Sequence, residues 1–400
     1  MRILFVGLDP PLPATNGHRI RTAAVLRALV ADGHDVTLVS FHDPQDSVDM
    51  EGLKRLCRSV DLMPPAIEGT AGIRSYLGRL RSAATLLPYT VHRFSTREMR
   101  ATLGRHLSRQ AFDLVVCDEA YAMTDLPPTR PPVVVDTIQI AFLLLRRYSA
   151  RARNPLVRLY AGLEYWKTRR WEIAAGNQAS ALVACSEAER RLYAELCPRT
   201  PVFLVPNVVD TEHFVPTDDP GGGTVLYTGG MDWHPNRDAV EFFATSILPT
   251  LRELIPPVRF RVAGRAPAPE FRQRLESVAG VEFSGTVPDM RTEIARATVC
   301  VVPLRIGTGT RLKILEAGAM EKAMVSTHLG AEGLELTDGE EIVLVDDPAA
   351  FAREVARLLR DPARRRTMGQ AARHRVVKQY GTPALQSALR DCLHHVTRRS

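Results

Sequence analysis

Residues 307–327 read GTGTRLKILEAGAMEKAMVST: a glycine-rich loop, an alanine-rich helical pattern and a short apolar strand pattern. Another apolar run, residues 298–304, comes directly before the loop. Strand, loop, helix and strand in this order form a βαβ unit with parallel strands. The same alternation recurs along both halves of the chain. The sequence therefore predicts an α/β protein with two Rossmann-like, doubly wound parallel-sheet domains facing across a cleft.

The loop has the composition of a phosphate-binding site. Gly307 and Gly309 allow a ligand to approach the backbone closely. Thr310 is expected to cap a helix that begins near Arg311. The amides around Thr308, Gly309 and Thr310 would then point toward the cleft, where the positive end of the helix dipole suits a diphosphate.

Two cations and one acid follow this loop. Arg311 and Lys313 lie in the first helical turn, where positive charge is unfavourable against the helix dipole, so an anionic partner would explain them. Glu316, one turn further on, is placed to accept hydrogen bonds from vicinal hydroxyls such as those of a ribose. An ordinary capped surface helix with a Lys313–Glu316 pair explains the same residues equally well from physics alone.

The domain boundary is marked by residues 211–224, TEHFVPTDDPGGGT, in which prolines, aspartates and glycines cluster. We therefore expect an N-terminal domain over 1–205, a linker over 206–223 and a C-terminal domain over 224–380. The last segment, 381–400, is amphipathic and is expected to cross back and pack on the first domain.

Polar residues stand at the ends of the predicted strands in the N-terminal half. Gly17 begins the first predicted helix, and two later apolar strands end in carboxylates. Ligands usually bind at the carboxyl ends of parallel strands, although helix capping explains the acids comparably well. The candidates for contact with an acceptor are His18, Arg21, Asp118, Glu119 and Asp136.

The chain is basic, with a net charge of +7 and a pI of about 9.2. Residues 72–110 are almost free of acids. Solvated helix faces are the simpler explanation, and a basic surface that meets an anionic membrane or an anionic acceptor is the alternative. No aromatic-and-basic recognition module accompanies these residues, so nucleic acid is not expected as a partner.

Several classes of protein are disfavoured. Residues 1–7, MRILFVG, are too short for a signal-peptide core, and no apolar run reaches the length of a transmembrane helix. We therefore expect a cytoplasmic protein, and peripheral contact at the inner membrane face is the alternative that the basic residues 72–110 leave open. The six scattered cysteines predict structural thiols, and no metal-binding spacing, DxD, P-loop or GxSxG motif is present. A dinucleotide oxidoreductase would need glycines directly after the first strand and an earlier acid than Asp43.

The second half resembles a family 4 glycosyltransferase of the GT-B fold. The resemblance lies in residues 226–267, beginning LYTGGMDWHPN, and in residues 281–334, which contain SGTV and GTGTRLKILEAGAMEKAMVST. The first half fits more loosely, through TNGHRIRTAAVLRALVADGHDVTLVSF at 15–41 and VPNVVDTEHFVP at 205–216. The match covers most of the chain, with specific motifs only in the C-terminal part.

The resemblance implies a nucleotide-sugar donor bound mainly by the C-terminal domain, an acceptor bound mainly by the N-terminal domain, and transfer with retention. It implies no essential metal and no cofactor beyond the nucleoside diphosphate sugar. Glu316 resembles the second acid of the family's Glu, seven residues, Glu motif, which holds the donor ribose. Gly17 resembles the loop glycine that lies against the donor phosphate. The strand edge that would meet the nucleobase contains Gly285, Thr286 and Val287.

Two features depart from the family's pattern. The first acid of the motif would fall at Thr308, and the basic pair after the first C-terminal strand is replaced by Gly229, Gly230 and Asn236. We expect the loop, with Arg311 and Lys313, to neutralise the diphosphate instead.

The function expected from these features is transfer of a hexosyl or deoxysugar group to an acceptor in polysaccharide or natural-product biosynthesis. The acceptor would be a glycan, a lipid-linked glycan or a small molecule. Two alternatives remain: a catalytically degenerate GT-B protein that binds a nucleotide sugar or an envelope glycan, and a nucleotide-sugar epimerase.

Overall fold

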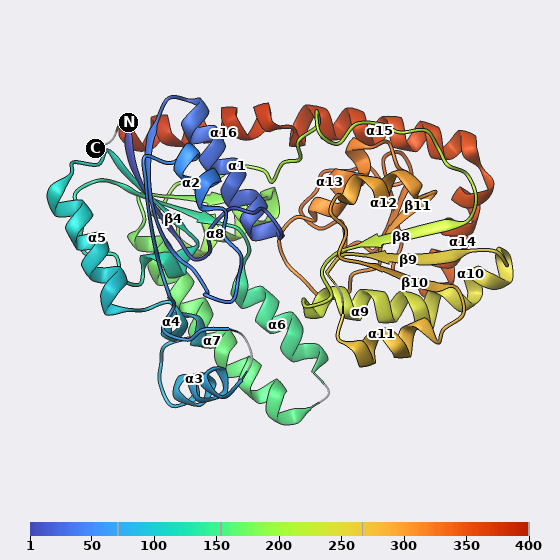
Figure 1. Cartoon of the computed structure of the whole chain (residues 1–400), viewed down its shortest axis with the longest axis horizontal. Helices are drawn as coiled ribbons and strands as arrows, with labels where there is room; N and C mark the ends of the chain where they lie inside the picture. The colour runs from blue at the N-terminus through green and yellow to red at the C-terminus, as the bar shows by residue number, and fades with distance from the viewer. Residues whose placement is uncertain (70–71, 153, 266, 399–400) are drawn as a thin grey trace. The chain divides into compact units, whose positions relative to one another are not determined.

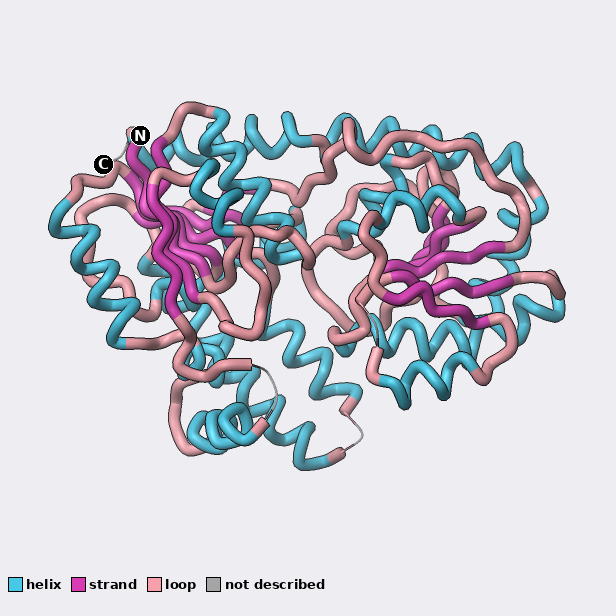
Figure 2. The backbone as a smooth tube through the Cα atoms, in the orientation of Figure 1, coloured by secondary structure: helices cyan, strands magenta, loops and turns pink. Residues whose placement is uncertain are grey.

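The computed structural model describes residues 1–69, 72–152, 154–265 and 267–398. They form two compact units: Met1–Pro206 with Leu385–Ser400, and Asn207–Ala384. Each unit consists of a parallel β-sheet with helices packed on it (Figure 1; Figure 2). The prediction of two Rossmann-like parallel-sheet domains is therefore confirmed.

The sheet of unit 1 has the strand order β3-β2-β1-β4-β5-β6-β7, and all its pairings are parallel. Its inner strands are buried on both faces, which is why they read as continuous apolar runs. The edge strand β3 was not predicted, because its sequence SVDLM is half-buried and lacks such a run. The strands are β1 (Arg2–Gly7), β2 (Asp35–Phe41), β3 (Ser59–Met63), β4 (Leu114–Asp118), β5 (Val133–Thr137), β6 (Ala181–Ala184) and β7 (Val202–Leu204).

Local capping sets several helix ends in unit 1. The Asn16 side chain accepts from the Arg19 amide at the start of α1, and Gly33, with φ of 75°, follows its end. The helices are α1 (Gly17–Ala31), α2 (Met50–Leu56), α3 (Ile73–Ala83), α4 (Tyr89–Arg93), α5 (Arg97–Arg109), the 3₁₀ turn η1 (Ala120–Met123), α6 (Ala141–Arg151), α7 (Pro155–Gln178) and α8 (Glu187–Leu196).

The last helix, α16 (Thr382–Thr397), lies mostly in unit 1. Arg390 on this helix forms a bidentate ion pair with Asp32, with its Nε 2.7 Å from the carboxylate. The His395 ring packs edge-on against Phe203 of β7, with 5.2 Å between ring centroids. The C-terminal segment from Leu385 therefore packs on the unit formed by the first 206 residues.

The sheet of unit 2 has the strand order β10-β9-β8-β11-β12-β13, again with parallel pairings throughout. The strands are β8 (Thr224–Thr228), β9 (Arg259–Ala263), β10 (Val281–Gly285), β11 (Val299–Val302), β12 (Met324–Ser326) and β13 (Val343–Leu344). The helices are α9 (His234–Phe242), the π turn η2 (Phe243–Ile247), α10 (Leu248–Leu254), α11 (Pro269–Glu276), α12 (Met290–Arg296), α13 (Leu312–Ala319), α14 (Pro348–Arg360) and α15 (Pro362–Tyr380).

The segment expected as a free linker, 206–223, is mostly attached to unit 2. The Val209 amide donates to the Tyr380 carbonyl over 2.9 Å, and Val209 forms a β-bridge with Gly381. Asp219 accepts from the Arg365 guanidinium of α15 at 2.6 Å. Because these contacts join residues far apart in the sequence, the composition of the segment did not reveal them.

Each sheet has one switch point, where the chain begins to add strands on the other side of the first strand. In unit 1 it lies between β1 and β4, and in unit 2 between β8 and β11. The carboxyl ends of such a strand pair are where doubly wound proteins usually bind ligands. The fold therefore marks one candidate position in each unit.

Candidate functional site

Glycines shape the backbone at the switch point of unit 2. Gly229 follows β8 with φ of 150°, and Gly307 stands in the loop after β11 with φ of 144°. A Cβ atom at Gly229 would lie only 3.0 Å from Lys313 Nζ, and one at Gly307 only 2.7 Å from an Arg311 guanidinium nitrogen. Any side chain at these positions would therefore fill the space beside the two cations.

Lys313 lies at this end of the sheet. Its Nζ is 3.8 Å from the centroid of the Tyr227 ring and donates to Asn236 Oδ1 over 3.3 Å. The Tyr227 hydroxyl donates to the same oxygen at 2.7 Å, and Asn236 Nδ2 donates to the Gly230 carbonyl at 2.8 Å. This network fixes the ammonium group beside the glycine turn after β8.

The surroundings of Lys313 disfavour its charge. Burial lowers the pKa of Lys313 to about 7, and the nearby Arg311 charge adds to this effect while Glu316 opposes it. A diphosphate at this position would raise the pKa of Lys313 again, because an opposite charge favours the ammonium form. The site is therefore suited to an anion that restores the charge of Lys313.

The beginning of α13 differs from the prediction. The expected Thr310 cap is wrong: the helix begins at Leu312, the N-cap residue is Arg311, and no side chain caps it. The Thr310 hydroxyl instead accepts a hydrogen bond from Asn207 Nδ2. The Ile314 amide donates to the Arg311 carbonyl over 3.0 Å, and no side chain caps the amides of Leu312 and Lys313, which suit an anionic group.

Arg311 folds back on its own loop. Its guanidinium donates to the backbone carbonyls of Thr308 and Gly309, and the side chain is nine-tenths buried. In this arrangement Arg311 holds the shape of the loop between β11 and α13. Direct contact between Arg311 and a phosphate remains a prediction.

Two side chains of the predicted site have unused hydrogen-bonding capacity among the described residues. The Thr308 hydroxyl is buried without a partner. The Glu316 carboxylate has no side-chain hydrogen bond to another described residue, and burial raises its pKa to about 7 against the opposing influence of Lys313. A ligand that donated hydrogen bonds to these groups would satisfy them.

The predicted donor residues of unit 2 fall into two groups. Those at the switch point are Gly229, Gly230, Gly307, Thr308, Gly309, Thr310, Arg311, Lys313 and Glu316. Gly285 ends β10, and Thr286 and Val287 follow it, two strands away from β8. The sequence missed the role of Tyr227, which supports Lys313. An aromatic residue one place before the end of a predicted strand was the only signal for it.

The switch point of unit 1 holds a histidine and two carboxylates. His18 Nε2 donates to Asp118 Oδ2 over 2.8 Å, and Thr22 Oγ1 donates to the same oxygen at 3.2 Å. Burial alone would lower the pKa of His18, but the charge and hydrogen bond of Asp118, with smaller contributions from Glu119 and Asp9, raise it to about 9. The His18 side chain is 24% exposed, so part of it is accessible to a ligand.

Glu119 adds strain and an unsatisfied acceptor to this cluster. Its backbone has φ of 68°, which is rare for a residue with a side chain. Its Oε1 is buried without a hydrogen-bond partner among the described residues, and burial raises the pKa of Glu119 to about 7. Gly17, the first residue of α1, directly precedes His18 and belongs to the same unit.

Arg21 and Asp136 do not suit the acceptor role that we expected for them. The Arg21 guanidinium donates to both oxygens of Asp136, at distances down to 2.6 Å, and to the Val205 carbonyl at 3.0 Å. Arg21 is 2% exposed and Asp136 is 3% exposed. The pair therefore ties α1 to β5 and to the end of β7 inside unit 1.

We expect Asp136→Asn to destabilise unit 1 by about 3–5 kcal/mol, because it leaves a buried guanidinium without its counter-charge. At roughly 2–4 °C per kcal/mol, the melting temperature should fall by about 6 °C or more. The matched control is Arg390→Met, which removes the exposed ion pair with Asp32 and should cost about 1 kcal/mol or less. Equal losses of melting temperature in the two variants would contradict the structural role of Arg21 and Asp136.

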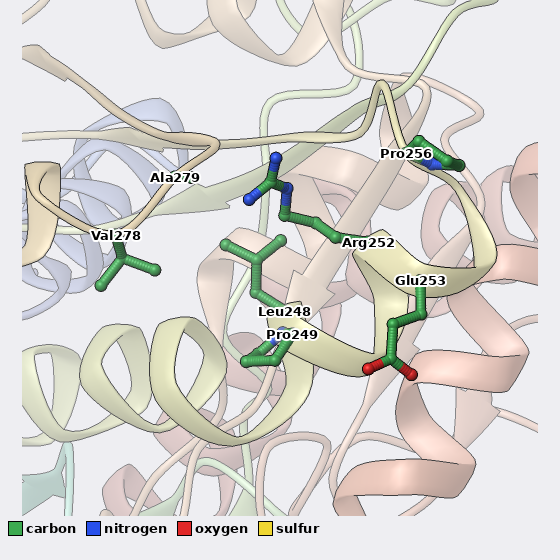
Figure 3. A pocket seen from close by; sticks show the side chains of 7 residues that line it. All are labelled: Leu248, Pro249, Arg252, Glu253, Pro256, Val278 and Ala279. Carbon is green, nitrogen blue, oxygen red and sulfur yellow. The ribbon is translucent and has the colours of Figure 1, made fainter.

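One hollow in unit 2 lies away from the candidate site (Figure 3). It is lined by Leu248, Pro249, Arg252, Glu253, Pro256, Val278 and Ala279. Pro256 precedes β9 and Ala279 precedes β10, so the hollow lies near the amino ends of these strands. Parallel sheets bind ligands at the opposite, carboxyl ends, and the hollow is not part of the site.

Three further properties concern metal binding, the cysteines and membrane-spanning helices. No group of three or more His, Cys, Asp or Glu side chains within the described ranges is placed to hold a metal ion. The six cysteines are all buried and unpaired, as expected for structural thiols. In the part of the chain that the structure describes, no helix is both long and apolar enough to cross a bilayer.

Two protein-family models match the chain. The model described as Glycosyltransferase Family 4 matches residues 15–213, and the model described as Glycosyl transferases group 1 matches residues 222–361. The boundary between the matches falls inside the segment that follows the end of unit 1.

Individual proteins are also similar in sequence to this chain. The chain is 21% identical to an uncharacterized 44.6 kDa protein in the cps region of Klebsiella pneumoniae, over 88% of this chain and 90% of that protein. It is 28% identical to the GDP-mannose-dependent alpha-(1-6)-phosphatidylinositol monomannoside mannosyltransferase of Mycolicibacterium smegmatis, over 50% of this chain and 58% of that enzyme.

Among solved structures, the sucrose-phosphate synthase of Thermosynechococcus elongatus superposes with a TM-score of 0.76 at 18% identity, covering 100% of both chains. At this identity the similarity establishes a common fold. With family models on both halves of the chain, it leads to one conclusion. The chain belongs to the family 4 glycosyltransferases and has the GT-B fold.

Proposed function

We propose that this glycosyltransferase moves a hexosyl or deoxysugar group from a nucleoside diphosphate sugar to an acceptor hydroxyl, with retention of anomeric configuration and without an essential metal. The observation that carries the donor proposal is the position of Lys313. Its ammonium group lies beside the glycine turn after β8, in surroundings that disfavour its charge. A diphosphate is the partner that would best stabilise a cation placed there.

The donor would be held by three kinds of group from unit 2. The uncapped amides of α13 and Lys313 would bind the diphosphate, with Arg311 keeping the loop in shape or reaching the phosphate directly. Glu316 would accept from the ribose hydroxyls, and the Thr308 hydroxyl would meet the sugar or a phosphate. The backbone at Gly285, Thr286 and Val287 would face the nucleobase. Gly17 of unit 1 would approach the donor phosphate.

The chemical step would rest on stabilisation of the leaving group. As the bond from the sugar to the diphosphate breaks, negative charge develops on the phosphate beside Lys313 and the α13 amides. Fixed positive groups at such a position typically supply several kcal/mol of barrier reduction. The acceptor hydroxyl would attack from the same face of the sugar and lose its proton to the departing phosphate.

The acceptor would be bound by the cluster at the switch point of unit 1. The partly exposed His18 and the unpartnered oxygens of Asp118 and Glu119 would offer hydrogen-bond donors and acceptors to a hydroxyl-rich ligand. This chemistry fits a glycan, a lipid-linked glycan or a polyhydroxylated small molecule. The unpaired thiols support a cytoplasmic location.

A second candidate function is binding without transfer. Thr308 stands where the family has an acid, and a hydroxyl cannot supply the charge of a carboxylate. A catalytically degenerate GT-B protein would bind a nucleotide sugar or an envelope glycan and release neither free nucleotide nor product. An epimerase of the same fold would release nucleotide without needing an acceptor.

The first test is thermal unfolding of the full chain with UDP, GDP, ADP, dTDP and NAD in separate samples. A ligand at about a hundred times its dissociation constant stabilises the native state by about 2.7 kcal/mol, which corresponds to roughly 5–11 °C in a unit of this size. We expect one nucleoside diphosphate to give such a shift, and its base would then identify the base of the donor. A shift with NAD alone would overturn the proposal.

Nucleotide release then separates the three functions. With the matching nucleotide sugar, a transferase releases nucleoside diphosphate slowly by hydrolysis and faster when an acceptor is added. Fast release without an acceptor would support the epimerase, and nucleotide-sugar binding with no release would support the degenerate binder.

A further inference from the structure

Helix α3 buries small and polar side chains and exposes its large apolar ones, which is the reverse of an ordinary surface helix. Its buried side chains are Ser75, Gly78 and Ser82, which are small or polar. Its large apolar side chains point outward: Ile73 is 76% exposed and Leu77 is 57% exposed, with Tyr76 and Leu80 also exposed. A surface helix normally turns its apolar stripe toward the core.

The first half of α7 repeats this pattern. Leu156, Leu159, Leu163 and Trp166 follow one another at intervals of three or four residues, so they form one stripe of the helix. All four are exposed, Leu156 to 75% and Trp166 to 66%. The same stretch of α7 is therefore apolar on the side that faces away from the protein.

Polar contacts hold these two helices together from the other side. Ser82 Oγ of α3 donates to Glu164 Oε1 over 2.6 Å, and Lys167 Nζ donates to the Ser82 carbonyl over 2.8 Å. The Tyr89 amide donates to the second oxygen of Glu164 at 2.8 Å. Because Glu164 and Lys167 are buried, this polar network fixes which sides of α3 and α7 remain outside.

We call the exposed apolar residues of α3, of the loop that follows it and of the first half of α7 the apolar face. It contains eleven of the sixteen exposed large apolar side chains of the described residues. Figure 1 shows α3 and the beginning of α7 beside the end of α6, on the part of unit 1 that extends away from its sheet. The apolar face consists of Ile73, Tyr76, Leu77, Leu80, Leu86, Leu87, Leu156, Val157, Leu159, Leu163 and Trp166.

The charges within the segments of the apolar face are positive, and one of them, Arg74, pairs with Glu68 just outside these segments over 3.3 Å. The stretches 73–97 and 141–163 each contain five arginines and no aspartate or glutamate. Arg74, Arg79, Arg81 and Arg158 lie within the exposed segments themselves. An anionic lipid surface is complementary to this combination, because it offers phosphate groups to the arginines and an acyl interior to the leucines.

The same charges argue against a second copy of the chain as the occupant. Self-association through this face would bring the arginines of both copies together, and neither copy supplies a carboxylate within these stretches to pair with them. Like charges brought into contact at an interface oppose binding. A bilayer has no such conflict.

We propose that the apolar face is a membrane-docking surface, which inserts its leucines and Trp166 into the interfacial region of an anionic bilayer while the flanking arginines contact lipid phosphates. This surface extends the basic region 72–110 to α7. The inference does not depend on the transferase activity, so failure of either proposal leaves the other standing.

Co-sedimentation of the full chain with vesicles tests the proposal. One set of vesicles is phosphatidylcholine alone and the other contains about one third phosphatidylglycerol, each in about 0.1 M and about 1 M salt, between which the Debye length falls from about 10 Å to about 3 Å. We expect binding to the anionic vesicles at low salt, weaker binding at high salt, and a blue shift of tryptophan emission that Trp166→Phe removes.

Two variants locate the contact. Leu77→Asp/Leu80→Asp should weaken the partition into anionic vesicles by about tenfold or more, because burial of one leucine side chain alone contributes at least that much. Val377→Asp changes a 45% exposed valine on α15 and should bind within about twofold of wild type. Thermal unfolding should be similar for all three proteins, because both variants alter exposed side chains.

Three results would overturn the inference. The first is absence of vesicle binding by the wild type, and the second is binding of the Leu77/Leu80 variant at the wild-type level. The third is a doubled mass in light scattering without lipid that the Leu77/Leu80 variant abolishes, which would assign the face to self-association.

Discussion

Replacement of Lys313 by methionine is expected to lower kcat/KM for the nucleoside diphosphate sugar by about 100- to 1000-fold. Methionine preserves the length and apolar character of the side chain but removes the ammonium group beside the glycine turn after β8. The charge on the leaving diphosphate would then lose its nearest fixed cation. The measurement is nucleotide release under steady-state conditions, with the donor below its KM.

The control for this substitution is Lys322→Met. Lys322 is a buried lysine of unit 2; its Nζ donates to the Ala295 carbonyl over 3.0 Å, and burial lowers its pKa as it does that of Lys313. It lies before β12, at the opposite end of the sheet from Lys313. We expect Lys322→Met to change stability but to leave kcat/KM within about threefold. Similar turnover of Lys313→Met and wild type would remove Lys313 from the mechanism.

The pH dependence of nucleotide binding gives a second readout for Lys313. Because the pKa of Lys313 is lowered to about 7, the free protein loses this positive charge as the pH rises through neutrality. A bound diphosphate favours the charged form, so binding above pH 7 takes up a proton and weakens as the pH rises. Lys313→Arg keeps its charge at these pH values and should flatten the dependence. Calorimetry in two buffers of different ionisation enthalpy measures the proton uptake directly.

We expect Glu316→Gln to stabilise the protein without nucleotide and to weaken its binding of nucleotide. The folded-state pKa of Glu316 is raised to about 7 from an ordinary value near 4.5, chiefly by burial. The native state therefore binds this proton more tightly than the unfolded state, and stability falls as the pH rises from about 4.5 through 7. Removal of the buried charge should stabilise the free protein at pH 8 by about 1–3 kcal/mol, or roughly 2–12 °C in melting temperature.

The same substitution should weaken nucleoside diphosphate binding by about 10- to 100-fold, because a charged acceptor for the ribose hydroxyls is lost. The melting temperature of Glu316→Gln would then be higher than that of wild type without ligand and would respond little to nucleotide. Glu354→Gln, at a partly exposed acid on α14, should change neither quantity measurably. An unchanged nucleotide-induced shift in Glu316→Gln would show that this carboxylate does not bind the donor.

Much of the architecture followed from local patterns. Continuous apolar runs marked the inner strands of both sheets, because a parallel strand is buried on both faces. The loop at 307–310 could be placed between a strand and a helix, because glycine and threonine spacing is a property of neighbouring residues. The weaker edge strand β3 escaped detection, since a half-buried strand carries no such run.

The roles of individual polar residues were harder to predict. Thr310 has the right residue type for a helix cap, but its hydroxyl is taken by Asn207, which lies 103 residues earlier in the chain. Arg21 and Asp136 looked like open ligand contacts, and they form a buried pair across 115 residues. A residue type indicates what a side chain can do, while its partner depends on which segments the fold brings together.

The sequence by itself determined the α/β class, the division into two sheet units and the position of the glycine-rich loop, because strand and helix periodicity act over a few residues. Only the tertiary structure decided that Lys313 stands beside the turn after β8 and that α3 and α7 turn their leucines outward. The physical reason is that burial and pairing are set by contacts between distant segments. In α3 the polar network of Ser82, Glu164 and Lys167 determines which side faces inward, and no periodicity within α3 contains that information.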